Sequence, residues 1–371
     1  MPSSISSSDT AAARLPSLPW AVLLAAAFGI AAAFVLSMEI ALALRGFHPT
    51  IVDSQAQWEK QRARASALGR RALVLVGDSR MQTDMDADAL RSGSGLEPVD
   101  LGIDGSSFVP VLAGLAHDPR VTGTVVVGYS DVEVVRPDAN NASAHYESDF
   151  EKTARSRALP DYHVTEAWLA DRLHAVLASY ADGARPSTSL LMRVFDPDAR
   201  PQNVVTLPDR TRKIDFSHAN LRSLGLRSAQ FELDGDAHAG TGSVDDRERA
   251  LLARIAALGP SDGAIHAARL AAIASYARAI GERGGRVIFV ALPTAGHVRE
   301  IDDRLFPRAL FWDRFAAHCP GTCVRADDDP ALRDLVPPDG LHVDGSDRRR
   351  FTLALVTALG LGKAPADGAG R

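Results

Sequence analysis

The stretch ALVLVGDSR, residues 72–80, decides the fold of this 371-residue chain. Its apolar run ends abruptly at Gly77, and a polar segment follows. Parallel strands that are buried on both faces have continuous apolar sequences, so we predict such a strand here. Ligands of open parallel sheets bind beyond the carboxyl ends of the strands. Ser79 therefore lies where a functional side chain is expected.

The rest of the chain extends the same pattern. Further apolar or β-branched runs predict strands at 97–105, 123–131 and 286–293. Helical patterns lie between and after them, at 84–93, 109–117, 264–285, 306–318 and 348–360. Strands that alternate with helices indicate a parallel sheet with both faces covered. The sequence thus predicts one α/β domain over 71–360.

A long polar segment, 132–262, separates the third and fourth predicted strands. Its one clear helical pattern covers 165–183, and 195–218 is typical of a loop. We interpret the segment as an insertion that caps the core rather than as a separate domain. Its basic cluster DRTRK (209–213) is interpreted as solvated surface, with a site for an anionic glycan as the alternative.

The N-terminal region has a different character, because no charged residue occurs from 15 to 38. At about 1.5 Å per residue, such a helix can cross a bilayer core about 30 Å thick. Secretory signal peptides have a shorter apolar region of about 7–15 residues and a cleavage site. We therefore predict an uncleaved transmembrane signal anchor over 15–44. A disordered N-terminus (1–14), a charged connector (45–70) and a frayed tail (361–371) complete the predicted organisation.

Composition excludes some classes of protein. The formal net charge is −5 and no basic arm with interleaved aromatic residues occurs, so no nucleic-acid partner is predicted. Cys319 and Cys323 are the only cysteines, and their spacing excludes a C-x-x-C redox motif. A zinc site usually needs about four ligands, so no metal or other cofactor is predicted. A local disulfide and two free thiols remain alternatives for this pair.

Catalytic chemistry is indicated by the motif DGLH, which ends at His342 in the loop before the last predicted helix. A serine hydroxyl needs an adjacent base to act as a nucleophile, and a carboxylate orients the histidine that serves as this base. Asp339 can reach Nδ1 of His342 within one loop turn, which leaves Nε2 to face Ser79. Asp344 is the competing carboxylate.

An oxyanion hole is also expected at this edge of the sheet. Backbone N–H groups stabilise the negative charge that develops during acyl transfer. Ser79 lies near the start of a predicted helix, and Gly105 follows the second predicted strand without a side chain that could obstruct close approach. We predict that the amides of these two residues form the hole.

The motifs VGDSR, LGIDGSS, GYSD and DGLH occur in this order along the chain. They resemble the four blocks of the SGNH (GDSL-like) hydrolase superfamily, over about residues 71–360. The resemblance implies a flavodoxin-like three-layer α/β/α sandwich, with Ser79, Asp339 and His342 as the catalytic triad. The family's third block is G-x-N-D, in which the asparagine is an oxyanion donor. Ser130 takes that position here, and we expect it to be the third donor.

A membrane-anchored SGNH domain with a large insertion also looks like proteins of bacterial cell-surface acylation, of the alginate O-acetyltransferase and lipoteichoic acid D-alanylation types. The resemblance implies a serine esterase or O-acyltransferase that acts on O-acyl esters, O-acetyl above all, of an extracytoplasmic polysaccharide. It also implies a multi-spanning membrane acyltransferase as a partner. The alternative is a catalytically weak SGNH-like protein that binds glycan or scaffolds that acyltransferase.

The same resemblance implies a single-pass protein of the inner (cytoplasmic) membrane, with its catalytic domain in the periplasm. The distribution of basic residues favours the opposite orientation, because only Arg14 precedes the span. Four basic residues follow it, namely Arg45, Lys60, Arg62 and Arg64. The rule loses force when a long domain follows the span, and we expect an extracytoplasmic domain.

Overall fold

The computed structural model describes residues 19–136, 141–155, 162–180, 186–196, 198–235 and 242–362. The predicted disordered N-terminus (1–14) lies outside the described residues, as does all but the first two residues of the predicted tail (361–371).

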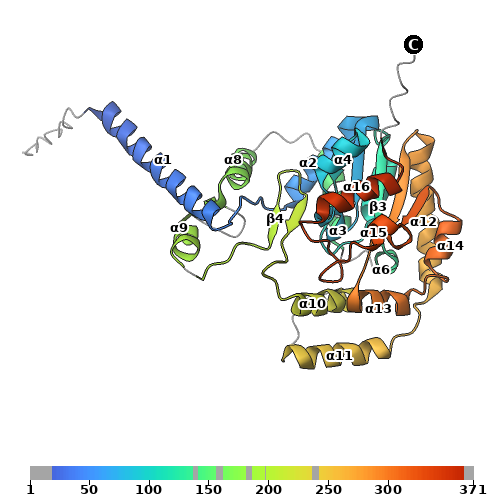
Figure 1. Cartoon of the computed structure of the whole chain (residues 1–371). Helices are drawn as coiled ribbons and strands as arrows, with labels where there is room; N and C mark the ends of the chain where they lie inside the picture. The colour runs from blue at the N-terminus through green and yellow to red at the C-terminus, as the bar shows by residue number, and fades with distance from the viewer. Residues whose placement is uncertain are drawn as a thin grey trace, which may run out of the picture.

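A five-stranded parallel sheet forms the centre of the molecule, with the strand order β2-β1-β3-β6-β7 (Figure 1). The strands are β1 (Ala72–Val76), β2 (Glu97–Asp100), β3 (Thr124–Tyr129), β6 (Arg286–Ala291) and β7 (Thr322–Arg325). The predicted α/β class with a parallel sheet is thereby confirmed. The sequence analysis does not predict β7, because this edge strand is short, only partly buried and lacks a continuous apolar run.

Helices cover both faces of the sheet because alternate residues of each strand point to opposite sides. In β1, Val74 and Val76 belong to one apolar cluster, whereas Leu73 and Leu75 belong to the other. The first cluster includes side chains of α2 (Gln55–Leu68), α5 (Val109–His117), α12 (Gly263–Glu282) and α14 (Trp312–Ala317). The second includes side chains of α3 (Ser79–Thr83), α4 (Ala87–Ser94), α15 (Pro330–Arg333) and α16 (Arg348–Ala358).

Helix α2 lies within the region predicted as a connector, 45–70, and packs against the sheet. Trp58 is fully buried, and its indole Nε1 donates a hydrogen bond to the Leu101 carbonyl at 3.1 Å. On the same helix, buried Arg62 forms an ion pair with Glu147 at 2.9 Å. The sequence predicts that the globular part begins at Arg71. In the structure it begins earlier, because α2 already packs against the sheet.

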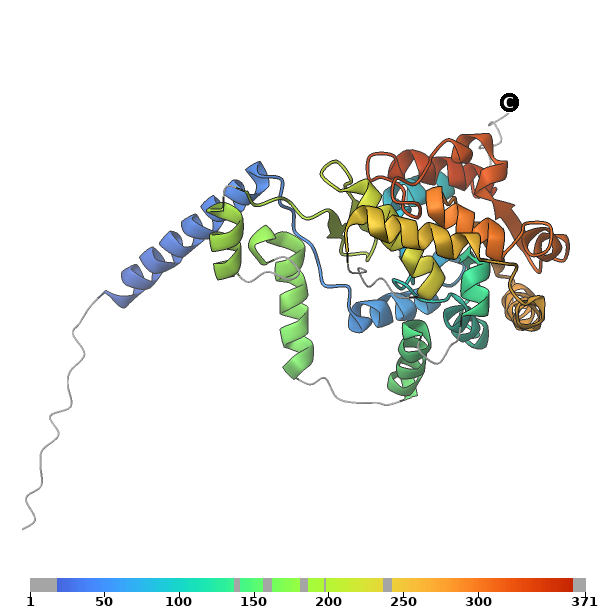
Figure 2. The same cartoon turned by 90° about the horizontal axis from the view of Figure 1, so that it is seen from below.

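The segment between β3 and α12 has more regular structure than its sequence predicts. Its helices are α6 (Asp131–Val135), α7 (Ala142–Arg155), α8 (Tyr162–Val176), α9 (Pro186–Ser189), α10 (Leu221–Asp234) and α11 (Val244–Ala256). The predicted loop 195–218 contains an antiparallel pair, β4 (Val204–Thr206) and β5 (Arg212–Ile214). Strands this short have too few residues to show a period in the sequence. Helix α10 packs against α13 (Gly296–Leu305), with α11 beside them (Figures 1 and 2).

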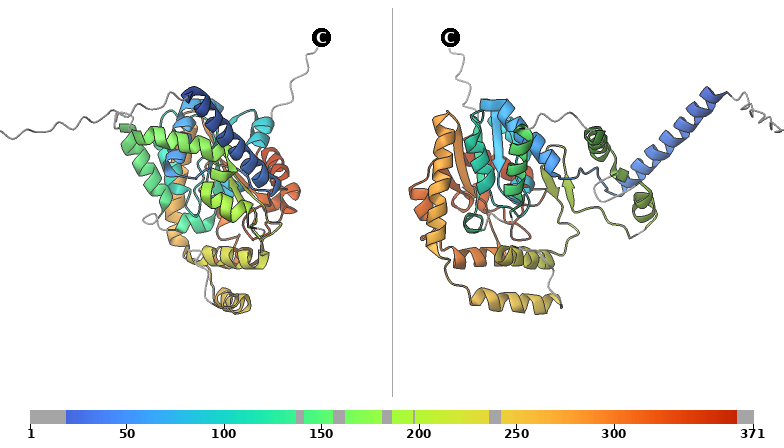
Figure 3. Two further views of the ribbon diagram at one scale, coloured as in Figure 1. Left: turned by 90° about the vertical axis from the view of Figure 1, so that its left-hand side faces the viewer. Right: turned by 180° about the vertical axis from the view of Figure 1, so that it is seen from behind.

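Helix α1 (Trp20–Leu44) extends away from the sheet and its covering helices (Figure 3). It is the one helix in the described ranges that is long and apolar enough to cross a membrane. Its side chains are exposed up to residue 37, and Met38 and Leu42 near its C-terminal end are buried. The structure is thus consistent with the predicted anchor, by length and composition.

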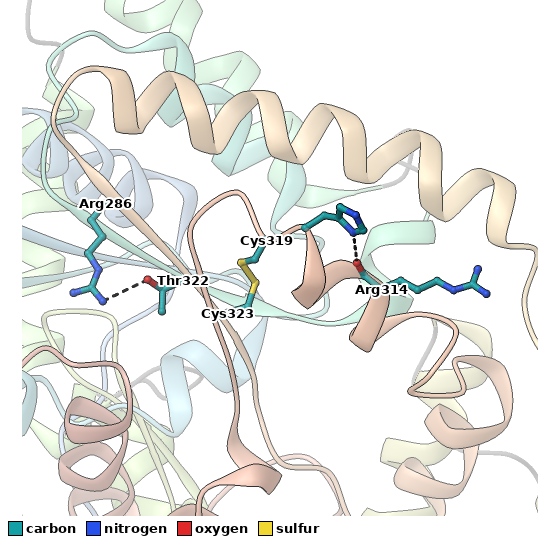
Figure 4. The surroundings of a disulfide bond; sticks show 6 residues. Arg286, Arg314, Cys319, Thr322 and Cys323 are labelled. Atoms are coloured by element: carbon teal, nitrogen blue, oxygen red, sulfur yellow. Dashed lines mark hydrogen bonds between the residues drawn. A yellow bond between two sulfur atoms is a disulfide. The ribbon is translucent and has the colours of Figure 1, made fainter.

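The two cysteines form a disulfide, so of the two alternatives the structure contains the bridge (Figure 4). Cys319 follows α14, and Cys323 lies in β7, next to the Thr322 hydroxyl that accepts a hydrogen bond from Arg286 at 3.5 Å. The bridge ties the edge strand of the sheet to the helix that precedes it.

Candidate active site

Ser79 is the first residue of α3 and follows β1 after a two-residue turn. The turn is held by Asp78, whose carboxylate accepts a hydrogen bond from the Arg80 backbone N–H at 2.9 Å and caps the helix. The Arg80 side chain is buried and also pairs with Asp78, at 2.9 Å. The local sequence GDSR therefore fixes the serine at the carboxyl edge of the sheet.

His342 connects this serine to a carboxylate. Its Nε2 lies 2.9 Å from Ser79 Oγ, and its Nδ1 lies 2.8 Å from Asp339 Oδ2. The second oxygen of Asp339 accepts backbone hydrogen bonds from Leu341, at 3.0 Å, and from His342, at 2.8 Å. The three predicted triad residues are thus brought together in a continuous hydrogen-bonded line, in the order that acyl transfer by a serine requires.

The competing carboxylate, Asp344, has other partners. It accepts hydrogen bonds from Ser346 and from the backbone N–H of Phe216. Asp339 is therefore the carboxylate on His342, as the motif spacing predicts.

Gly340 gives the DGLH loop its shape. Its φ is +92°, a region that residues with a Cβ rarely adopt. A Cβ there would lie 3.0 Å from the Ala295 carbonyl oxygen and 3.0 Å from a methyl group of Val298. Any other residue at position 340 would be strained in this conformation and would crowd Ala295 and Val298.

The charges around His342 favour its protonated form. Burial works to lower the pKa of His342, but the hydrogen bond and charge of Asp339, with the charges of Asp84 and Asp78, raise that pKa above its ordinary value. Burial alone would raise the pKa of Asp339. The hydrogen bond to His342 outweighs burial, so the pKa of Asp339 is lowered. His342 is thus a stronger base than a free histidine, and Asp339 stays ionised beside it.

A second carboxyl group, Asp84, lies near the histidine. Burial raises the pKa of Asp84 to about 7, against the opposing charge of His342. Its Oδ1 accepts hydrogen bonds from the Val343 backbone N–H at 3.0 Å and from the Thr83 hydroxyl at 2.8 Å. Asp84 therefore joins α3 to the residue that follows His342.

The triad lines a cavity of about 590 Å³. Elements of the segment between β3 and α12 supply much of the wall: residues of β4, β5 and α10 face the triad across the space. The apolar part of the lining consists of Val204, Ile214, Phe216, Leu224, Phe231 and Leu341. The polar part outside the triad consists of Asp78, Thr83, Asp104, Asn203, Arg212, Arg227, Ser228 and Glu232.

Gly105 also lines this cavity, in a turn after β2. Its φ is +62°, and a Cβ there would lie 3.0 Å from the Phe231 ring, so a glycine is needed. Its carbonyl accepts a hydrogen bond from Arg136 at 3.2 Å. The backbone amides of Ser79 and Gly105 donate no hydrogen bond to any described residue. Both amides are therefore without an acceptor among the described residues.

Ser130 is not brought into this site. It precedes α6 and lines a separate cavity of about 50 Å³, together with Arg80, Tyr129 and Asp131. It is not among the described residues that line the cavity of Ser79. Asp131, beside it, is held by the Tyr129 hydroxyl at 2.6 Å and by His266 at 2.7 Å. The expected role of Ser130 as third oxyanion donor has no geometric support.

Arg210 supports the wall of this cavity from behind β4 and β5, and the sequence does not reveal this role. The cluster 209–213 is interpreted from the sequence as solvated, and for Arg210 this is wrong, because only 1% of its surface is exposed. Its guanidinium donates to Asp53 at 2.7 Å and to the carbonyls of Asp100 and Gly102 at 3.0 Å each. These bonds attach the β4–β5 hairpin to the loop after β2. No local sequence pattern predicts the contact with Asp53, because the two residues are 157 positions apart.

No group of three or more His, Cys, Asp or Glu side chains among the described residues is arranged to hold a metal ion. The chain matches no protein-family model and is not significantly similar to any curated protein. Arguments about function therefore rest on the arrangement of Ser79, His342 and Asp339 in the cavity.

Proposed function

We propose that this protein is a membrane-anchored serine esterase or O-acyltransferase of the SGNH (GDSL-like) type. Its proposed substrates are O-acyl esters, O-acetyl above all, of an extracytoplasmic polysaccharide. One observation carries the proposal: Ser79 Oγ, His342 and Asp339 form a continuous line with distances of 2.9 and 2.8 Å in a cavity of about 590 Å³. Cavities of about 300–1,000 Å³ are typical of small-molecule sites.

The arrangement of the sheet supports the SGNH assignment. When the separate β4–β5 hairpin is left out, the order β2-β1-β3-β6-β7 becomes 2-1-3-4-5, which is the order of flavodoxin-like folds. Helices on both faces fit a three-layer α/β/α sandwich. In this proposal the segment 132–262 is an insertion, and its hairpin and α10 cap the site.

The geometry supports the following reaction. Ser79 Oγ attacks the ester carbonyl while His342 Nε2 takes the hydroxyl proton, and Asp339 stabilises the imidazolium. The amides of Ser79 and Gly105 hold the oxyanion. The C–O bond to the alcohol breaks, and His342 gives its proton to the leaving alkoxide. Water, or a sugar hydroxyl, then attacks the acyl-serine as His342 takes its proton, and Ser79 is regenerated when it receives that proton.

The proposed location is the inner membrane, with a single span and a periplasmic catalytic domain. Helix α1 supports the anchor. The disulfide of Cys319 and Cys323 supports an oxidising compartment, because such bonds persist outside the cytoplasm. In this setting a multi-spanning membrane acyltransferase is the proposed partner.

A second candidate is a catalytically weak SGNH-like protein that binds glycan or scaffolds that acyltransferase. The position of Ser130 outside the cavity favours it, because one side-chain donor of the family is then absent from the oxyanion hole. Loss of one donor in such a hole costs about 10²–10³ in kcat.

Turnover of a chromogenic acetyl ester by the purified full chain separates these candidates. We expect turnover that Ser79→Ala reduces by at least about 10³-fold, since the nucleophile is lost. Ser130→Ala is the matched control, because it removes the same hydroxyl group from a position outside the cavity, and its turnover should stay near that of the wild type. Absence of turnover in the wild type would support the scaffold. Addition of an oligosaccharide acceptor then distinguishes transfer from hydrolysis.

A further inference from the structure

The C-terminal end of α1 packs against part of the segment between β3 and α12 (Figures 1 and 3). We call this part the collar, and it consists of α8 (Tyr162–Val176), η3 (Ala178–Tyr180) and the described residues of 190–199, which begin with η4 (Leu190–Val194). Met38 and Leu42 of α1 pack in a buried apolar cluster with Ala178 of the collar. The η3 and η4 parts of the collar therefore pack directly on α1.

Polar contacts fix the same junction. The Glu39 carboxylate accepts hydrogen bonds from the backbone N–H groups of Ala178, at 2.8 Å, and Ser179, at 3.0 Å. Arg45, just after α1, donates to the Val194 carbonyl at 2.8 Å. A carboxylate buried in lipid would be costly, so Glu39 and its partners mark where α1 leaves an apolar environment.

The exposed part of α1 has the length of a bilayer core. Its helical residues 20–37 are all exposed, and burial starts at Met38. At about 1.5 Å per residue this part is about 27 Å long, against a hydrocarbon core of about 30 Å. If this part spans the membrane, the collar lies at the membrane–water boundary on the side of the catalytic domain.

The collar exposes several large apolar side chains. Trp168, Leu169 and Val176 of α8 are 55%, 51% and 68% exposed, and Met192 and Phe195 are 62% and 68% exposed. Arg172 lies over the Trp168 ring at 5.4 Å. Tryptophan is enriched at membrane interfaces, and long basic side chains there reach toward the headgroups. Several exposed large apolar side chains in one short part of a chain are typical of an interaction surface.

We propose that the collar is a second membrane-binding site, seated in the interfacial layer of the same bilayer that α1 spans. Its occupant is the lipid surface, which Trp168, Leu169, Val176, Met192 and Phe195 enter to the depth of the headgroups. Continuity with α1 identifies this occupant, because lipid that surrounds residues 20–37 ends where the collar begins. The proposal rests on the span of α1 and is independent of the catalytic activity.

The segment that follows α1 also connects the anchor to the active-site cavity. The Thr206 backbone of β4 accepts from Ile51 at 3.1 Å and donates to the Thr50 hydroxyl at 2.8 Å. Residues 50 and 51 follow α1 directly, and β4 and β5 line the cavity of Ser79. The ester that reaches Ser79 is therefore expected close to the membrane surface.

Spin-label accessibility in proteoliposomes tests the proposal on the full chain. The native cysteines are bonded to each other, so Trp168→Cys and Phe195→Cys each introduce one reactive thiol. Leu24→Cys in α1 is the control for a position in lipid, and Val336→Cys, after α15, is the control for a position in water. Their side chains are 56% and 64% exposed. Vesicles of phosphatidylcholine and phosphatidylglycerol supply the bilayer. Labels are compared by collision with oxygen, which concentrates in lipid, and with a water-soluble nickel chelate.

We expect the labels at 168 and 195 to show a severalfold higher oxygen-to-nickel ratio than the label at 336, and a lower ratio than the label at 24, because headgroup depth lies between water and the hydrocarbon core. Labels at 168 and 195 that match the one at 336 would overturn the proposal. A label at 24 that is in water would remove its premise and overturn it as well. Ester turnover does not enter this readout, so failure of the collar and failure of the proposed enzyme are distinguishable.

Discussion

In the proposed reaction, His342 takes up a proton and releases it within one cycle. Only its neutral form can take the proton of Ser79, so the rate should rise with pH as His342 loses its proton. Asp339 raises the pKa of His342 above its ordinary value of 6.5, against the effect of burial. The acid limb of the pH–rate profile should therefore lie above pH 6.5.

Asp339→Asn should lower kcat by about 10⁴, because the amide no longer orients the imidazole in its reactive tautomer. It should also move the acid limb of the profile to lower pH, since the carboxylate that raises the pKa of His342 is gone. The measurement is kcat/KM of a chromogenic ester against pH. Asp344→Asn is the control, because Asp344 contacts Ser346 and Phe216 instead of His342, and an equal effect of both variants would contradict the assignment.

Asp84 gives a stability that depends on pH. Burial raises its pKa from 3.8 to about 7, so between these values the folded chain binds a proton that the unfolded chain has released. Stability therefore falls as pH rises through this window, because the folded state binds more protons than the unfolded state. The unpartnered, buried Oδ2 of Asp84 fits a carboxyl group that carries that proton.

Asp84→Asn should flatten this dependence. The amide oxygen can keep the bonds from Val343 and Thr83, and no group at position 84 then ionises. We expect the free energy of unfolding to fall less between pH 4 and 7 than in the wild type, by a few kcal/mol. Denaturant titrations at several pH values measure it. Asp100 and Glu147, whose pKa values burial also raises to about 7, are present in both proteins and cancel in the comparison. Identical pH slopes would contradict this account.

At the scale of elements, the β4–β5 hairpin decides how the cavity is closed. Its Arg210 holds it against the loop after β2, and Gly105 lies in the turn a few residues further along. Without Arg210, Asp53 would keep its ion pair with Arg212, at 2.8 Å, but the carbonyls of Asp100 and Gly102 would lose their donor. A buried acceptor left without a donor costs about 1–3 kcal/mol. The hairpin is therefore expected to depend on this one side chain.

Arg210→Ala should destabilise the protein by about 1–3 kcal/mol and raise KM for the ester, because the wall formed by β4 and β5 loosens. Lys213→Ala is the matched control, since Lys213 belongs to the same basic cluster but is exposed. Denaturant unfolding and steady-state kinetics of both variants measure the effects. Equal, small effects of the two substitutions would show that the hairpin does not rely on the Arg210 contacts.

The strands differ in how well the sequence predicts them. The central strands β1, β3 and β6 are predicted because buried parallel strands have continuous apolar runs. The edge strand β7 and the short hairpin strands lack such runs. The triad is predicted because each of its residues follows a strand or precedes the last helix, and strand ends share one edge of the sheet. Ser130 meets the same criterion and lies elsewhere, since a position after a strand does not determine which cavity a side chain enters.

At the scale of the whole molecule, the anchor, the collar and the disulfide are consistent with a catalytic domain held at a membrane surface outside the cytoplasm. The central proposal is a chemical one: Ser79 would act as an activated nucleophile, because His342 Nε2 lies 2.9 Å from its hydroxyl oxygen. An isolated surface serine does not react with a fluorophosphonate, whereas a serine with a positioned base does.

Fluorophosphonate labelling of the purified full chain, with the modified residue located by mass spectrometry, tests this claim most directly. We predict covalent modification at Ser79, its absence in Ser79→Ala, and strong slowing in Asp339→Asn, whose histidine is no longer oriented. A wild-type chain that does not react, or that reacts at another residue, would contradict the claim.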